Sequence, residues 1–172
     1  MILTDGEKQN ASPYLMAVQT GRSHGWLLGC EDRRMVLIGE FFLASDDESA
    51  LGVGPRRSHD FPAVPCDGIY PDDAVWRWEA QLAGTESTLR HVVPMANDGF
   101  TVFAVPEPLC TALVCAGAEQ LRVAARLWAK AVSEPGDEIS PADATELLKR
   151  VSALAGNRTD KRLNLYCWYF AP

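Results

Sequence analysis

The chain has 172 residues and a mass of 18.8 kDa, the size of one ordinary domain with its own buried core. Hydrophobic residues make up 47% of it and charged residues 23%, and this composition excludes wholesale disorder. A formal net charge of -7 opposes binding to nucleic acid or to an anionic membrane surface, and it favours a basic protein partner.

The five cysteines are odd in number and lack paired spacings, which is typical of reduced thiols rather than of a disulfide framework. The first residues carry acids and no apolar stretch of signal-peptide length. No apolar run approaches the ~20 residues that a membrane-spanning helix requires. We therefore expect a soluble, cytoplasmic protein.

Three short apolar runs open the chain, at 14–20, 26–30 and 35–43, and turn residues separate them. Short runs of this kind predict antiparallel strands joined by hairpins, so we expect an N-terminal β meander over 1–44. The pattern is lost over 45–73, which is rich in acid, glycine and proline. This composition predicts a long loop, either ordered for a function or disordered.

Seven acids gather in the 45–73 loop with few basic residues, chiefly Arg56 and Arg57. One interpretation is a solvated loop. The other is an acidic docking surface that steers a basic partner to its site. The candidate partner-binding acids are Asp46, Asp47, Glu48, Asp60, Asp67, Asp72 and Asp73.

Residues 75–83 alternate between apolar and polar side chains, which predicts a half-buried strand, with a one-turn amphipathic helix as the alternative. Trp76 in this segment is a candidate anchor for a partner, because aromatic residues dominate binding hot spots. Further strands are predicted at 89–93 and 100–105, around the turn signal Asn97-Asp98-Gly99, giving a second meander over 74–105.

The last third changes to helical periodicity over 106–156. Two helices are predicted at 106–116 and 118–133, with a break at Gly117, and a third begins at the cap Ser140 and stops at Gly156. The apolar run within 162–170 predicts a strand that returns to the sheet. Together these elements predict one α+β domain: a mostly antiparallel sheet, about three helices packed on one face, and a C-terminal strand.

The sequence Gly21-Arg22-Ser23-His24-Gly25 matches the Gly-x-Ser-x-Gly elbow of serine hydrolases. His59 or His91 would then serve as the base, with Asp60 or Asp73 orienting it, although no spacing supports this arrangement. A glycine-rich hairpin turn explains the same residues. No Cys-x-x-Cys or His-x-x-x-His pair occurs, so no metal site and no cofactor are predicted.

The hydrophobic patterning of the C-terminal third carries a resemblance to a known family. Its residues are Pro106, Leu109, Leu113, Leu121, Ala124, Trp128, Ala129, Leu147, Leu148, Leu154 and the run Leu165-Tyr166-Cys167-Trp168. This layout resembles that of small bacterial immunity proteins of polymorphic and contact-dependent toxin systems.

The resemblance implies a non-catalytic cytoplasmic protein that binds and neutralises a toxin domain encoded nearby, often a basic nuclease. It carries over no functional residue, because immunity proteins place their interfaces differently. Two alternatives remain open: a small serine hydrolase that uses Ser23, and an adaptor or subunit of a bacterial complex that associates through the terminal strand.

Overall fold

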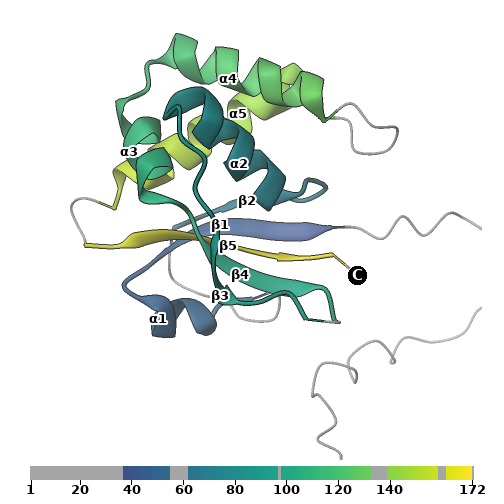
Figure 1. Cartoon of the computed structure of the whole chain (residues 1–172), viewed down its shortest axis with the longest axis vertical. Coiled ribbons are helices and arrows are strands. Elements are labelled where there is room, and N and C mark those ends of the chain that lie inside the picture. Colours follow the sequence, from purple (N-terminus) through teal and green to yellow (C-terminus); the bar gives the residue numbers. More distant parts are fainter. Residues whose placement is uncertain (1–36, 55–61, 97, 133–138, 159–161, 172) are drawn as a thin grey trace, which may run out of the picture. The chain divides into compact units, whose positions relative to one another are not determined.

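The computed structural model describes residues 37–54, 62–96, 98–132, 139–158 and 162–171. The predicted strands at 14–20 and 26–30, Ser23, His59 and Asp60 lie outside the described residues. Within them the chain forms a five-stranded antiparallel sheet with helices packed on it, which confirms the predicted α+β fold (Figure 1).

The sheet has the strand order β2-β1-β5-β4-β3, with antiparallel pairing throughout. The C-terminal strand lies at its centre and is hydrogen-bonded to β1 on one side and to β4 on the other. Both edges of β5 are therefore occupied, so it offers no edge for self-association. The strands are β1 (Ile38–Ala44), β2 (Ala63–Pro65), β3 (Arg90–Val93), β4 (Phe100–Ala104) and β5 (Asn164–Phe170).

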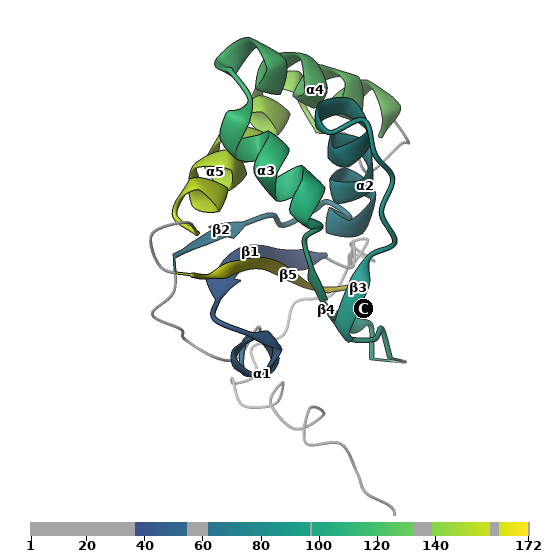
Figure 2. The same ribbon diagram turned by 60° about the vertical axis from the view of Figure 1, so that its left-hand side comes forward.

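Four of the five helices in the described chain cover one face of the sheet, and the short helix α1 lies against the other (Figures 1 and 2). Figure 2 shows α4 as the helix farthest from the sheet, with α2, α3 and α5 beneath it. The helices are α1 (Asp47–Leu51), α2 (Pro71–Leu82), α3 (Glu107–Cys115), α4 (Ala118–Ala131) and α5 (Pro141–Gly156).

The central strand is apolar along its length because both of its faces are buried. Successive side chains of a strand point to opposite faces. Cys167 and Tyr169 accordingly enter the main core beneath the helices, whereas Tyr166 and Trp168 enter a smaller cluster on the face of α1. In that cluster the rings of Tyr166 and Phe42 stack at 5.8 Å between centroids.

The main core is anchored by aromatic contacts between the helices and the sheet. The rings of Trp78 in α2 and Trp128 in α4 meet edge to face at 5.1 Å between centroids, and Trp78 also lies 5.8 Å from Phe41 of β1. All three side chains are at most 1% exposed. Such edge-to-face pairs stabilise a fold by about 0.5–1.5 kcal/mol beyond the burial of their area.

The predicted strand at 75–83 is wrong, because these residues belong to α2. Val75, Trp78 and Leu82 recur at three- and four-residue intervals and face the core, while Trp76 faces outward. Pro71 at the start and the acids after it favour a helix N-terminus. In a strand, Trp76 and Trp78 would share one face. In the helix they do not: Trp78 is buried in the core and Trp76 is exposed.

The predicted loop at 45–73 is also partly wrong, because this segment contains α1 and β2. Asp46 caps α1 by accepting a hydrogen bond from the Ser49 amide at 2.8 Å, so its acid marks a helix start. The region 74–105 holds most of α2 followed by the β3–β4 hairpin, rather than a meander of three strands.

The other elements agree with their predictions. The hydroxyl oxygen of Ser140 accepts the Asp143 amide at 3.1 Å, and α5 ends at Gly156 as expected. The break between α3 and α4 falls at Gly117, whose amide donates to the Gln120 side chain at 2.8 Å.

The buried side chain of Glu79 fixes the connection that follows α2. One of its oxygens accepts hydrogen bonds from the hydroxyls of Thr85, at 2.7 Å, and Ser87, at 2.6 Å. The other oxygen accepts the Ser87 amide at 3.2 Å. A fully buried carboxylate requires such partners, and these bonds direct the chain from α2 towards β3.

Candidate protein-binding surface

The first three candidate acids lie at the start of α1. Hydrogen bonds from Ser49 lower the pKa of Asp46, the helix cap. Asp47 forms an ion pair with Arg90 of β3 and accepts the Tyr166 hydroxyl at 2.9 Å, and these bonds lower its pKa. Glu48 is exposed. Two of the three acids therefore hold α1 in place.

The next candidate acids lie around the start of α2. Asp67 accepts the backbone amide of Gly39 at 3.1 Å. Asp72 accepts the hydroxyl of Tyr169 at 3.0 Å, which ties the helix to the central strand. Asp73 forms an ion pair with Arg77, one turn further along α2, at 2.7 Å. These carboxylates combine a structural contact with partial exposure to solvent.

The acids of 45–73 therefore form two separate groups rather than one continuous surface. Asp46 follows the end of β1, whereas Asp67 bonds to Gly39 near its beginning. Strand β2 pairs antiparallel with β1, and the chain then enters α2, which lies on the opposite face of the sheet from α1 (Figure 1). Only the second group lies beside Trp76, the predicted anchor.

The second group belongs to a surface with the composition of a binding hot spot. Tyr70 is 49% exposed and Trp76 is 44% exposed. The guanidinium of Arg77 lies 5.7 Å from the centre of the Trp76 ring, within range of a cation–π contact. Tyrosine, tryptophan and arginine are the residues most enriched in hot spots. We call Tyr70, Asp72, Asp73, Trp76 and Arg77 the α2 surface.

A cleft of about 360 Å³ opens beside the α2 surface. Its apolar side is formed by Trp128, Ala131 and Val132 of α4 and its end, and its polar side by Asp72 and Asp73 with Arg77. An aliphatic stem that packs on the apolar side would bring a cationic head group to the two carboxylates. A lysine or arginine side chain has this construction.

Sequence reasoning missed three exposed apolar residues on α4 and at the cap of α2. Of the seven large hydrophobic side chains that are exposed among the described residues, four lie on α4 or on α2 and its cap. Val123 and Leu127, each 45% exposed, lie one turn apart on α4 and off its buried stripe. That offset is the signal by which they could have been found. The four residues are Tyr70, Trp76, Val123 and Leu127.

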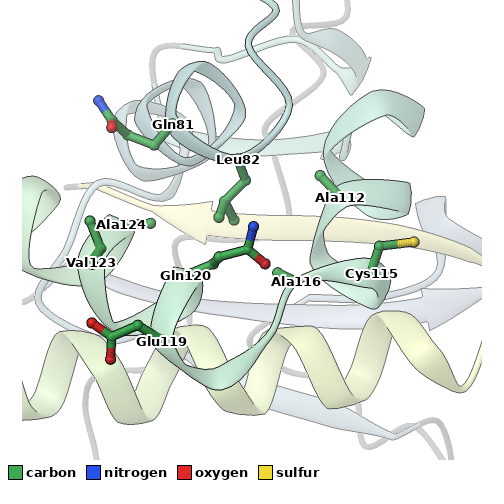
Figure 3. Close-up of a pocket in the computed structure, with 9 residues that line it drawn as sticks. All are labelled: Gln81, Leu82, Ala112, Cys115, Ala116, Glu119, Gln120, Val123 and Ala124. Atoms are coloured by element: carbon green, nitrogen blue, oxygen red, sulfur yellow. The ribbon is translucent and has the colours of Figure 1, made fainter.

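A second cleft, of about 320 Å³, lies where α2, α3 and α4 meet (Figure 3). Leu82 and Gln120 point into it, and Val123 stands at its rim (Figure 3). Gln120 already accepts a hydrogen bond from Gly117, and Glu119 at the edge is paired with Arg122. The cleft therefore suits apolar contact and has no arrangement for acid–base chemistry.

The residues of the predicted hydrolase site that are described do not converge. His91 of β3 has its Nδ1 atom 3.1 Å from the hydroxyl oxygen of Thr101, and that hydroxyl donates to the Val93 carbonyl at 2.7 Å. Asp73 contacts Arg77 on α2 instead of His91. Thr101 therefore positions the imidazole, where the hydrolase hypothesis requires a carboxylate.

In the part of the chain that the structure describes, no three metal-binding side chains lie close enough to share an ion, and no helix is long and apolar enough to cross a membrane. Comparison of the chain with protein-family models, with curated proteins and with solved structures gave no match.

Proposed function

We propose that this chain is a non-catalytic, cytoplasmic binding protein, and that it is the immunity protein of a bacterial toxin domain encoded nearby. The observation that carries the proposal is the α2 surface. Two half-exposed aromatic rings, a guanidinium and two carboxylates lie together on it, and all of these groups except the Trp76 ring line one cleft. This composition favours a protein partner over a small substrate.

The charge of the α2 surface favours a basic partner. Among the described residues that line the cleft, Asp72 and Asp73 are the acids and Arg77 the single cation, and the whole chain carries a net charge of -7. The overall charge attracts a basic domain over distances of about 10 Å, and the attraction weakens as salt is added. Basic nuclease domains of toxins have the complementary charge.

The aromatic residues have a different role in this proposal. Burial of the exposed part of Trp76 against a partner would stabilise the complex and slow its dissociation. The contact with Arg77 keeps the ring in one orientation before binding, so less side-chain entropy is lost. We therefore expect Trp76 to govern the dissociation rate and the carboxylates to govern the association rate.

Co-purification with the product of the adjacent gene tests the immunity proposal. We expect a stable complex with a toxin domain, whose activity the complex abolishes. A neighbouring product that is not a toxin and does not bind would overturn the immunity proposal.

The location of the interface is tested by two matched alanine variants. Trp76→Ala should weaken the complex by at least about tenfold, as expected for a hot-spot residue. Leu51→Ala is the control, because Leu51 is 54% exposed but lies on α1, on the other face of the sheet. Equal effects of the two variants would place the interface away from the α2 surface.

The role of the acids is tested by stopped-flow association at several salt concentrations. Asp73→Asn should lower the association rate severalfold at low salt and reduce its dependence on salt. The matched control is Glu48→Gln, which removes one exposed acid from α1. An association rate that falls only for Glu48→Gln would assign the steering charge to the α1 group instead.

A further inference from the structure

Three arginines line two adjoining clefts away from the α2 surface, and two of them are paired: Arg90 with Asp47 and Arg158 with Glu107. Two clefts of about 320 and 470 Å³ adjoin each other where β4 ends and β5 begins, and both are lined by Glu107, Arg158 and Asn164. Among the described residues that line the two clefts, three are cationic and one is anionic. The three cations are Arg90, Arg158 and Arg162.

Arg158 is the central residue of these clefts. Its side chain is only 15% exposed, its Nε atom donates to the Leu163 carbonyl at 3.3 Å, and one Nη atom pairs with Glu107. Glu107 itself is 69% exposed. A largely buried guanidinium is thus neutralised by a mostly exposed carboxylate, so a group that displaces Glu107 has to supply the negative charge that it removes.

Arg162 stands at the edge of the larger cleft with a backbone φ of 50°, the one non-glycine residue with positive φ in the described chain. This left-handed conformation costs a non-glycine residue about 1–2 kcal/mol. Strained residues of this kind concentrate at ligand-binding sites. Arg162 is exposed and lines the same cleft as Arg158.

The walls of the clefts complete the site. The Thr88 hydroxyl lies in the smaller cleft, and the Thr111 hydroxyl in the larger cleft donates to Glu107 at 3.5 Å. Val114 and Leu163 give the larger cleft an apolar wall. The planar guanidinium of arginine matches the geometry of phosphate and carboxylate groups and binds them through two parallel hydrogen bonds.

We propose that these clefts bind a small ligand through a phosphate or carboxylate group, which Arg158 holds with help from Arg162. Glu107 occupies Arg158 in the free protein and leaves it when the ligand binds. The apolar wall of Val114 and Leu163 contacts the body of the ligand. This proposal does not depend on the immunity function.

Isothermal titration of the full chain with inorganic phosphate and, separately, with acetate tests the proposal at constant ionic strength. We expect saturable one-site binding of at least one of the two anions. Phosphate alone would identify a phosphate ligand, and acetate alone would identify a carboxylate ligand. No saturable binding of either anion would overturn the proposal.

The competition between Glu107 and the ligand for Arg158 gives a sharper test. Glu107→Gln should strengthen anion binding by roughly tenfold, because it removes the carboxylate that competes for Arg158. The matched control is Glu119→Gln, which removes the carboxylate of a similar pair with Arg122 on α4, outside the clefts. If the two variants change the affinity equally, Glu107 is not a competitor and the proposal fails.

Arginine variants identify the binding groups. Arg158→Gln should weaken anion binding by at least about tenfold, the usual effect of losing a charged hydrogen-bond donor. Arg162→Gln should weaken it by a smaller factor, and this exposed position keeps the test valid if the first variant fails to fold. Arg122→Gln is the control. Unchanged affinity in Arg162→Gln, with the circular dichroism spectrum intact, would contradict the site.

Discussion

Replacement of Glu79 by glutamine tests the account of how α2 is fixed to the chain that follows it. The carboxylate is 0% exposed and accepts three hydrogen bonds, two from hydroxyls and one from the Ser87 amide. Glutamine keeps the shape of the side chain but is neutral, and its amide nitrogen cannot accept a bond. Either the Ser87 amide or the two hydroxyls then lose an acceptor.

The loss follows from the number and kind of these bonds. Hydrogen bonds to a charged group stabilise by about 1.5–3 kcal/mol and neutral ones by about 0.5–1.5 kcal/mol. We therefore expect Glu79→Gln to lower the free energy of unfolding by about 1–3 kcal/mol at pH 7. The midpoint of thermal unfolding should fall by about 2–4 °C for each kcal/mol lost.

The pH dependence has a definite sign. Burial by itself raises the pKa of Glu79, but the hydrogen bonds from Ser87 and Thr85 outweigh it and leave the pKa below its ordinary value. The ionised form therefore stabilises the fold fully above the unfolded-state pKa of about 4.3, and this contribution is lost as the pH falls through the lower folded pKa. The difference between wild type and Glu79→Gln should shrink below about pH 4.

Urea unfolding from pH 3 to pH 7 provides the measurement. Glu86→Gln is the control, because Glu86 is an exposed acid in the same connection. Equal stability of Glu79→Gln and wild type at pH 7, or a difference between them that does not change with pH, would refute the reasoning.

Three further predictions concern packing and reactivity. A Cβ at Gly39 would lie 3.0 Å from the Trp168 carbonyl oxygen, so Gly39→Ala should destabilise the fold by about 1–3 kcal/mol in urea unfolding. Gly156→Ala is the control and should not destabilise the fold, because the space around Gly156 is open. A larger loss of stability in Gly156→Ala than in Gly39→Ala would contradict the packing. Tyr169→Phe should cost about 1.5–3 kcal/mol by the same assay, because it removes the hydrogen bond to the Asp72 carboxylate, and no loss would show that this bond does not secure α2. Burial raises the pKa of the Cys110 thiol to about 12, while Cys115 is exposed. Iodoacetamide at pH 8 should therefore label Cys115 in the folded protein and Cys110 only after unfolding, as mapped by mass spectrometry. Labelling of Cys110 in the folded protein would contradict the burial of its thiol.

Local signals were sufficient to predict much of the fold. α5 carries a serine cap, a first-turn proline and a single apolar stripe, and β5 is apolar on both faces, so each element was identified from its own residues. α2 was mistaken for a strand because Trp76 and Trp78 lie two apart and both are apolar. Periodicity over a short window does not separate the two structures when an apolar residue also occupies the exposed face.

The candidate site was only partly predictable for a related reason. The composition of 45–73 showed that acids gather there, but the turn through β2 that sends Asp46 and Asp72 to opposite faces of the sheet depends on long-range pairing. The role of Trp76 as an anchor is predicted from its residue type alone and stays a prediction. The cluster around Arg158 joins α3, α5 and β5, which are distant in the sequence, so no local pattern indicates it.

Hydrogen exchange of the free protein and of its complex with the product of the adjacent gene tests the central claim most directly, because it locates the interface without any substitution. The account predicts that binding slows exchange of the backbone amides at 70–77, which include the α2 surface, and leaves the amides of α1 at 47–51 unchanged. Protection confined to α1, with none at 70–77, would contradict it.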